Sequence, residues 1–141
     1  MNEVKKASFA FKGYQVKKFS FEEPSDSSID SFTIGFDPSG IYDPKSGLFQ
    51  VNFQFKAFIK GETEQNVVTA FLSADFQFMD NLALNEIPSY FYKNSIAIVF
   101  PYLRSFVSTL TFQANVKPMI LPVLNLSDLE EPLRQNTVIA Q

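Results

Sequence analysis

Residues 95–129 decide the fold, and they read SIAIVFPYLRSFVSTLTFQANVKPMILPVLNLSDL. Between Asn94 and Val116 the only charged side chain is Arg104. Apolar side chains recur there at steps of three and four residues, a pattern that predicts a helix with one continuous apolar stripe. The stripe consists of Ile96, Val99, Phe100, Leu103, Phe106, Val107 and Leu110. We expect the rest of the chain to pack against this helix.

A second row of side chains widens the apolar arc of the helix and leaves a polar edge of only Arg104, Ser108 and Thr111. One sheet covers one side of so wide an arc, so we expect the other side to pack on another subunit. We expect a homo-oligomer, and specifically a tetramer. The row comprises Ile98, Tyr102, Phe106, Thr109 and Phe112, and all of these except Tyr102 form the predicted subunit interface.

A membrane span is the competing interpretation of so apolar a helix. It would place Arg104 inside the bilayer without a charged partner, at a cost of about 2.5 to 3.5 kcal/mol on insertion scales. Pro101 and Gln113 also count against a span, so we expect no membrane insertion. Pro101 removes a backbone donor, which predicts a bend or a helix that begins near Phe100.

Residues 118–126 form a connector after the helix. Pro118 and Pro122 exclude a helix there, and the apolar side chains between them exclude a solvated loop. Alternate side chains of an extended segment face opposite ways, so some should face outward and wall an apolar binding groove. The alternative is that they all pack the core. The predicted groove residues are Phe100, Tyr102, Met119, Ile120, Leu121, Leu124 and Leu126.

Four stretches in the first half of the chain alternate apolar and polar residues and predict strands at 8–21, 32–36, 49–60 and 68–78. The alternation changes phase at Gly13, which predicts a β-bulge. We expect residues 80–93 to be an irregular crossing and the segment after Leu129 to be a short or frayed helix. The predicted fold is α+β: one domain, residues 1–141, with a four-stranded antiparallel sheet backed by the long helix.

Composition excludes several functions. The chain has no cysteine and no histidine, which excludes disulfides, thiolate nucleophiles, imidazole bases and the usual zinc or haem ligands. The acidic residues are scattered and no glycine-rich phosphate loop is present, so we expect no enzyme activity, no cofactor and no metal. A net charge of −3 argues against nucleic acid as a partner. No basic and apolar leader opens the sequence, so a cytoplasmic location is the expectation.

Three short motifs resemble those of the SecB-type export chaperones. Residues 100–104, Phe-Pro-Tyr-Leu-Arg, look like that family's Phe-Pro-Tyr-x-Arg helix signature. Residues 20–24, Ser-Phe-Glu-Glu-Pro, resemble the end of its first strand. The connector is similar to its proline-rich stretch, with Asn125, Leu126 and Leu129 at the matching positions.

The resemblance implies a dimer of dimers that holds unfolded precursor chains in apolar grooves without ATP. In that family the client then passes to the SecA motor of the Sec translocon, and Glu22 matches one acidic position of the SecA-contacting surface. Lys18 stands where another acid is expected, so a client outside export, such as an antitoxin, is an alternative. A second alternative is an oligomeric binder of a small apolar ligand, which one closed pocket per subunit would favour over long open grooves.

Overall fold

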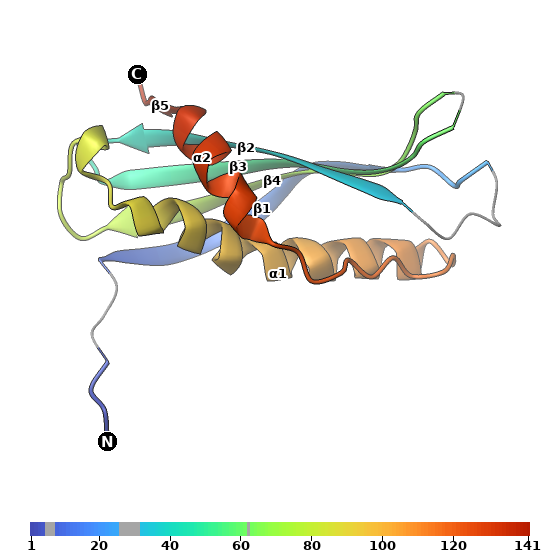
Figure 1. Cartoon of the computed structure of the whole chain (residues 1–141), viewed down its shortest axis with the longest axis horizontal. Helices are drawn as coiled ribbons and strands as arrows, with labels where there is room; N and C mark the ends of the chain where they lie inside the picture. Colours follow the sequence, from blue (N-terminus) through green and yellow to red (C-terminus); the bar gives the residue numbers. More distant parts are fainter. Residues whose placement is uncertain (5–7, 26–31, 62) are drawn as a thin grey trace.

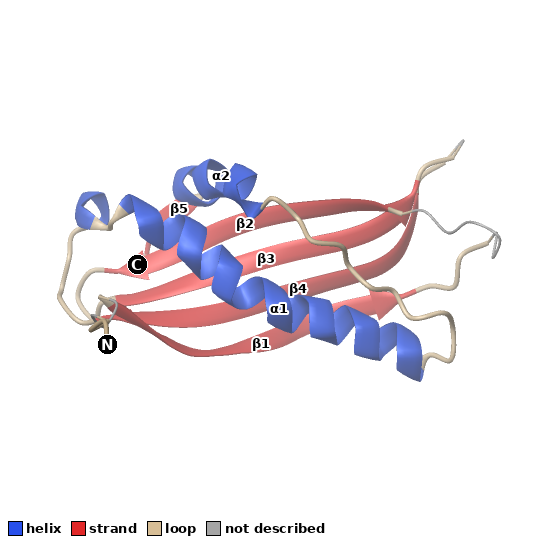
Figure 2. Ribbon diagram, turned by 60° about the horizontal axis from the view of Figure 1, so that its bottom comes forward, coloured by secondary structure: helices blue, strands red, loops and turns tan. Residues whose placement is uncertain are grey.

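The structure is a computed structural model that describes residues 1–4, 8–25, 32–61 and 63–141. A long helix lies across one face of a sheet, and a second, short helix covers one end of that face (Figures 1 and 2). The strands are β1 (Phe9–Phe21), β2 (Thr33–Asp43), β3 (Leu48–Ile59), β4 (Gln65–Phe78) and β5 (Thr137–Ile139). The helices are α1 (Ser89–Gln113) and α2 (Glu130–Gln135), with short 3-10 turns at Leu84–Glu86 and Leu126–Leu129.

The sheet has the strand order β1-β4-β3-β2-β5. The first four strands are antiparallel neighbours, as predicted, but the prediction of a four-stranded sheet was wrong because β5 adds a fifth strand parallel to β2. The Gly40 N–H donates to the Asn136 carbonyl at 3.1 Å, and the Ala140 N–H donates to the Tyr42 carbonyl at 2.8 Å. A three-residue strand is too short to show a period-2 pattern, so the sequence carried no signal for it.

The alternation predicted for β3 and β4 is confirmed, because their core-facing side chains are buried beneath α1. Phe49, Val51, Leu72 and Phe76 have no exposed surface at all. The pairing of β1 with β4 shifts between Phe11 and Gly13, and Gly13 has a φ of 133°, so the predicted bulge is also confirmed. Strand β2 runs further than predicted, through a proline, to Asp43.

Helix α1 begins at Ser89, before the predicted apolar stripe starts at Ile96 and before the alternative start near Phe100, and it includes residues that we expected in an irregular crossing. Pro101 lies inside it rather than at its start. The helical pattern in fact extends back from Ile96 to Phe91, whose ring contacts other core rings at centroid distances of 4.6 to 5.5 Å. The helix is long and apolar enough to cross a membrane by length and composition, but here it runs obliquely over the sheet with nine residues buried (Figure 2).

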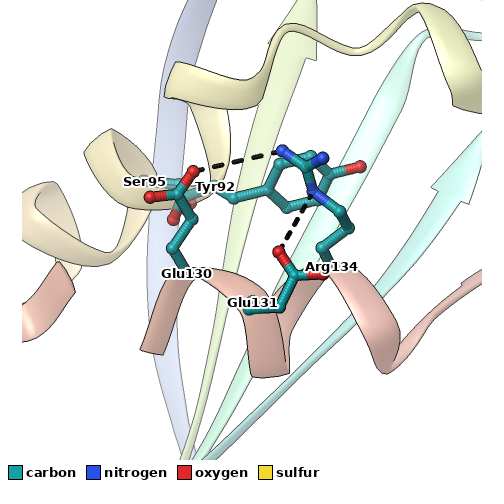
Figure 3. A network of polar contacts seen from close by, with 5 residues as sticks. All are labelled: Tyr92, Ser95, Glu130, Glu131 and Arg134. Atoms are coloured by element: carbon teal, nitrogen blue, oxygen red, sulfur yellow. Dashed lines mark hydrogen bonds and ion pairs between the residues drawn. The ribbon is translucent and has the colours of Figure 1, made fainter. Parts of the chain in front are cut away.

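Helix α2 confirms the predicted short helix and fastens the end of the chain to the start of α1. Arg134 lies between Glu130 and Glu131, at 4.0 Å from each carboxylate, and its guanidinium covers the Tyr92 ring at 4.9 Å (Figure 3). Burial raises the pKa of the Tyr92 hydroxyl, and the positive charge of Arg134 partly opposes that rise. The fully buried Leu133 completes the contact with the core.

Candidate functional site

The polar edge of α1 holds the connector. Arg104 donates from Nη2 to the Pro122 carbonyl at 2.8 Å, and the Ser108 hydroxyl donates to the Met119 carbonyl at 3.1 Å. The Met119 N–H donates to Thr111 Oγ1 at 2.8 Å. The three helix residues follow one another at steps of four and three, so they share one face. Their side chains therefore set both the path and the rotation of the connector.

The connector alternates as predicted, and Met119 and Leu121 are the side chains that face inward. Met119 and Leu121 are only 9% and 2% exposed, whereas Ile120 and Val123 are 76% and 92% exposed. The prediction that Leu121 stands on an open groove wall was therefore wrong. The bonds from Ser108 and Thr111 to the Met119 backbone turn its side chain, and that of Leu121, toward the sheet.

An open apolar cavity of about 370 Å³ lies between the first part of the connector and the ends of β1 and β2. We call it the connector cavity. Met119 and Ile120, two of the predicted groove residues, line it, and Phe21 and Phe32 line it although sequence reasoning missed both. Its lining comprises Phe21, Glu23, Pro24, Phe32, Val67, Thr111, Val116, Lys117, Pro118, Met119 and Ile120.

The remaining groove residues lie apart from this cavity. Phe100 and Leu126 meet Phe36 in a closed apolar contact with no room for a water molecule, and Leu124 is half-buried against the core. Tyr102 is two residues from Phe100, which is roughly 200° around a helix. It therefore faces β1, where its ring lies 4.6 Å from that of Tyr14. The structure thus divides the predicted groove among three places.

A second apolar surface lies where α1 faces β1. The Phe19 ring packs on Phe106 at 5.3 Å and yet is 54% exposed, and Phe112 is 65% exposed. We call this surface, with Tyr14, Phe19, Tyr102 and Phe106, together with the exposed Phe112 near the end of α1, the aromatic face. Of the predicted interface residues it includes Phe106 and Phe112. Thr109 is also exposed, while Ile98 is half-buried against the core.

The opposite face of the sheet carries charges of both signs. Lys18 and Lys56 line a shallow depression of about 560 Å³ together with Asp37. Glu22, the predicted motor contact, is exposed beyond the end of β1, and its backbone N–H donates to the Val67 carbonyl at 2.9 Å. Among the described residues, no group of three or more acidic side chains could hold a metal ion.

Comparison with known proteins shows a SecB-like fold. The structure superposes on the SecB-like chaperone Rv1957 of Mycobacterium tuberculosis, solved in complex with a ChAD peptide from the HigA1 antitoxin Rv1956, with a TM-score of 0.65. The match covers 84% of this chain and 91% of that one at 20% identity. A Streptococcus agalactiae protein of unknown function matches with a TM-score of 0.50 and 13% identity, over 82% of this chain and 97% of its own.

Similarity to known proteins at the level of sequence covers less of the chain than the structural similarity does. The sequence matches no protein-family profile. A segment of 59 residues is 39% identical to the uncharacterized protein MJ0357 of Methanocaldococcus jannaschii. That segment covers 39% of this chain and 38% of the relative, so the similarity spans well under half of either protein.

Proposed function

We propose that this protein is an ATP-independent holdase chaperone that binds unfolded or extended polypeptides. The observation that carries the proposal is the connector cavity, which is apolar and open and is walled by side chains on an irregular segment. Met119 gives one wall an adaptable side chain, which suits clients of different sequence. The SecB-like fold supports the same function, since Rv1957 with that fold was solved with a bound peptide.

A client outside protein export is the better supported of the two client classes. The peptide bound to Rv1957 comes from an antitoxin, and the outer face of the present sheet carries Lys18 and Lys56 beside its acids. Delivery of precursors to the SecA motor of the Sec translocon is the second candidate. Its support is the exposed carboxylate of Glu22 at the position that the SecB resemblance assigns to a motor contact.

We further propose that the aromatic face packs on a second copy of this chain. Aromatic side chains that are about half exposed in one subunit are typical of a surface that a subunit partner covers. A homotetramer in the cytoplasm, without enzyme activity, remains our proposal for the whole assembly. A binder of one small apolar ligand is the competing function, because the connector cavity is large enough for such a molecule.

The test is the suppression of aggregation of chemically denatured citrate synthase, followed by light scattering without nucleotide. The wild-type protein should suppress scattering near a stoichiometric ratio, and adding ATP should change nothing. Ile120→Asp should weaken suppression because it puts a charge at the rim of the connector cavity. Val123→Asp is the matched control, since Val123 is also an exposed aliphatic residue of the connector but does not line the cavity.

Both variants should melt within a few degrees of the wild type, because neither side chain is buried. Failure of the wild-type protein to suppress scattering would contradict the chaperone function. Equal suppression by Ile120→Asp and Val123→Asp would instead show that clients bind away from the connector cavity. Saturable binding of a fatty acid at one site per subunit, without any effect on scattering, would favour the small-ligand function.

A further inference from the structure

Strand β2 has a backbone edge that the chain covers only in part. On the side away from β3, β5 pairs with residues 40–42 of β2. Among the residues that the structure describes, no strand pairs with residues 33–39 on that side. Figure 2 shows β5 beside one end of β2 only, with the rest of this edge outermost in the sheet.

The bonds to β5 reveal which residues of β2 face this edge. The Gly40 N–H donates to the Asn136 carbonyl, just before β5, and the Tyr42 carbonyl accepts from the Ala140 N–H, just after it. The even-numbered residues of β2 therefore direct their backbone N–H and C=O groups toward this edge. The direction of the backbone groups alternates along an antiparallel strand, and therefore Ile34 and Phe36 also direct their N–H and C=O groups away from β3. Each of these two residues offers one donor and one acceptor at the open edge.

Pro38 divides the edge into two parts. It has the same phase as Ile34 and Phe36, but it has no N–H to give. This position explains how a proline fits inside β2, because its missing donor faces the edge and costs no bond to β3. The ladder of β5 begins at Gly40, because the chain before Thr137 is in α2. The stretch around Ile34 and Phe36 is thus a separate pairing site.

The open stretch begins next to a residue that lines the connector cavity. Phe32, which lines that cavity, comes just before β2 and has the same parity as Ile34 and Phe36. The side chain of Phe36 faces the helix side, since its ring lies 5.3 Å from Phe55 and 5.9 Å from Phe100. A strand added at this edge would direct every second side chain to the same apolar side.

We propose that the client binds as an extended segment that pairs its backbone with Ile34 and Phe36 and inserts an apolar side chain into the connector cavity. This inference rests on the proposed chaperone function. The occupant is a polypeptide because only an extended peptide presents alternating donors and acceptors at the spacing of a strand. Backbone pairing is independent of client sequence, whereas the cavity selects a large apolar side chain at one position.

The test uses a fluorescein-labelled ten-residue peptide of alternating Leu and Thr with one central Phe, followed by fluorescence anisotropy. Two analogues carry N-methyl groups on alternate residues. The first is methylated along one edge of the extended chain, and the second along the other edge. N-methylation removes the donors of one edge and leaves every side chain in place. One analogue should therefore bind about tenfold or more weakly, and the other should bind within about twofold of the parent peptide, because each lost backbone bond weakens binding about two- to tenfold.

Two variants of the protein test the same bond from the other side. Ile34→Ala and Ile34→Pro both shorten the side chain, but only the proline removes the N–H at the open edge. Neither change removes a bond to β3, so both proteins should keep the wild-type circular dichroism spectrum. Ile34→Pro should bind the parent peptide about two- to tenfold more weakly than Ile34→Ala does.

Other results would overturn the inference in distinguishable ways. If both analogues and both variants bind alike while the wild type still suppresses aggregation, clients are held by side chains alone and the chaperone function stands. If the wild type binds neither the peptide nor unfolded citrate synthase, the function fails and the inference with it. A lower subunit number for Ile34→Pro than for Ile34→Ala would show that this edge pairs with a second copy of the chain.

Discussion

Gly40 lies where β2, β3 and the end of the chain meet, and it has no room for a side chain. A Cβ there would lie 2.7 Å from Cε1 of Phe49 and 2.7 Å from Oγ1 of Thr137. Phe49 is fully buried in the core, so its ring cannot move aside. We predict that Gly40→Ala lowers the free energy of unfolding by about 1 to 3 kcal/mol, measured by urea denaturation.

Gly35→Ala is the control for this prediction. It adds the same methyl group to the same strand, but the nearest atom is Cγ of Lys56 at 3.4 Å, in a flexible side chain. Its effect on the unfolding free energy should stay within about 0.5 kcal/mol. If the two variants lost the same stability, the crowding around Gly40 would not be the cause.

At the scale of single residues, the connector shows what the sequence could predict. Alternation established that neighbouring side chains face opposite ways, but it did not decide whether Met119 or Ile120 faces inward. That choice depends on hydrogen bonds between the connector backbone and α1. The residues that make these bonds, Ser108 and Thr111 among them, were visible in the sequence as a polar edge, and their partners were not.

At the scale of elements, the attachment of the connector to α1 can be tested at Thr111. This buried residue accepts the Met119 N–H at Oγ1 and donates to the Val107 carbonyl at 2.9 Å. Thr111→Val keeps the shape of the side chain and leaves the buried N–H of Met119 without an acceptor. We predict a loss of about 1 to 3 kcal/mol in unfolding free energy.

The comparison for Thr111 is Ser108→Ala, which removes the donor to the carbonyl of the same connector residue. Ser108 is only part-buried, so water can replace its hydroxyl, and the loss should be smaller, about 0.5 to 1.5 kcal/mol. A Thr111→Val protein as stable as the wild type in guanidinium titration would mean that the connector is held chiefly by its buried side chains.

The sequence predicted long elements better than short ones. The first four strands and the central helix were predicted because each has several repeats of its pattern. The predicted start of α1 lies too late in the sequence. Pro88 favours an irregular segment, although Phe91 and Tyr92 after it carry the helical spacing backwards from Ile96. Strand β5 has three residues and two of them are exposed, so neither alternation nor burial distinguishes it from a tail.

At the scale of the whole molecule, the aromatic face predicts an oligomer. The wild-type protein should sediment as an oligomer at micromolar concentration. The double variant Phe19→Asp and Phe112→Asp should sediment as smaller species, because association would bury two unpaired carboxylates. Val123→Asp, which puts a carboxylate on an exposed aliphatic position of the connector, should leave the subunit number unchanged. A well-folded wild-type monomer at this concentration would contradict the prediction.

The sequence predicted the width of the apolar arc on α1, but it did not predict which residues of the arc face the sheet and which face away from it. The arc predicted two covered sides, and the oblique course of the helix over the sheet decides which residues belong to each. That course leaves Phe112 exposed at the end of α1 and keeps Ile98 against the core. Spacing along a helix gives angles around its axis and carries no information about the angle at which it crosses a sheet.

The way in which the connector is held predicts how affinity at the proposed client site depends on the size of the client side chain. It belongs to no sheet ladder, and side-chain bonds from α1 together with the buried Met119 and Leu121 hold it in place. A segment held in this way opens at a lower free energy than the whole domain unfolds. Under the proposed function, a small client side chain would enter the connector cavity as it stands, and a bulky one would enter by displacing the connector. Affinity should then level off with increasing side-chain volume, where a rigid pocket would show a sharp cutoff.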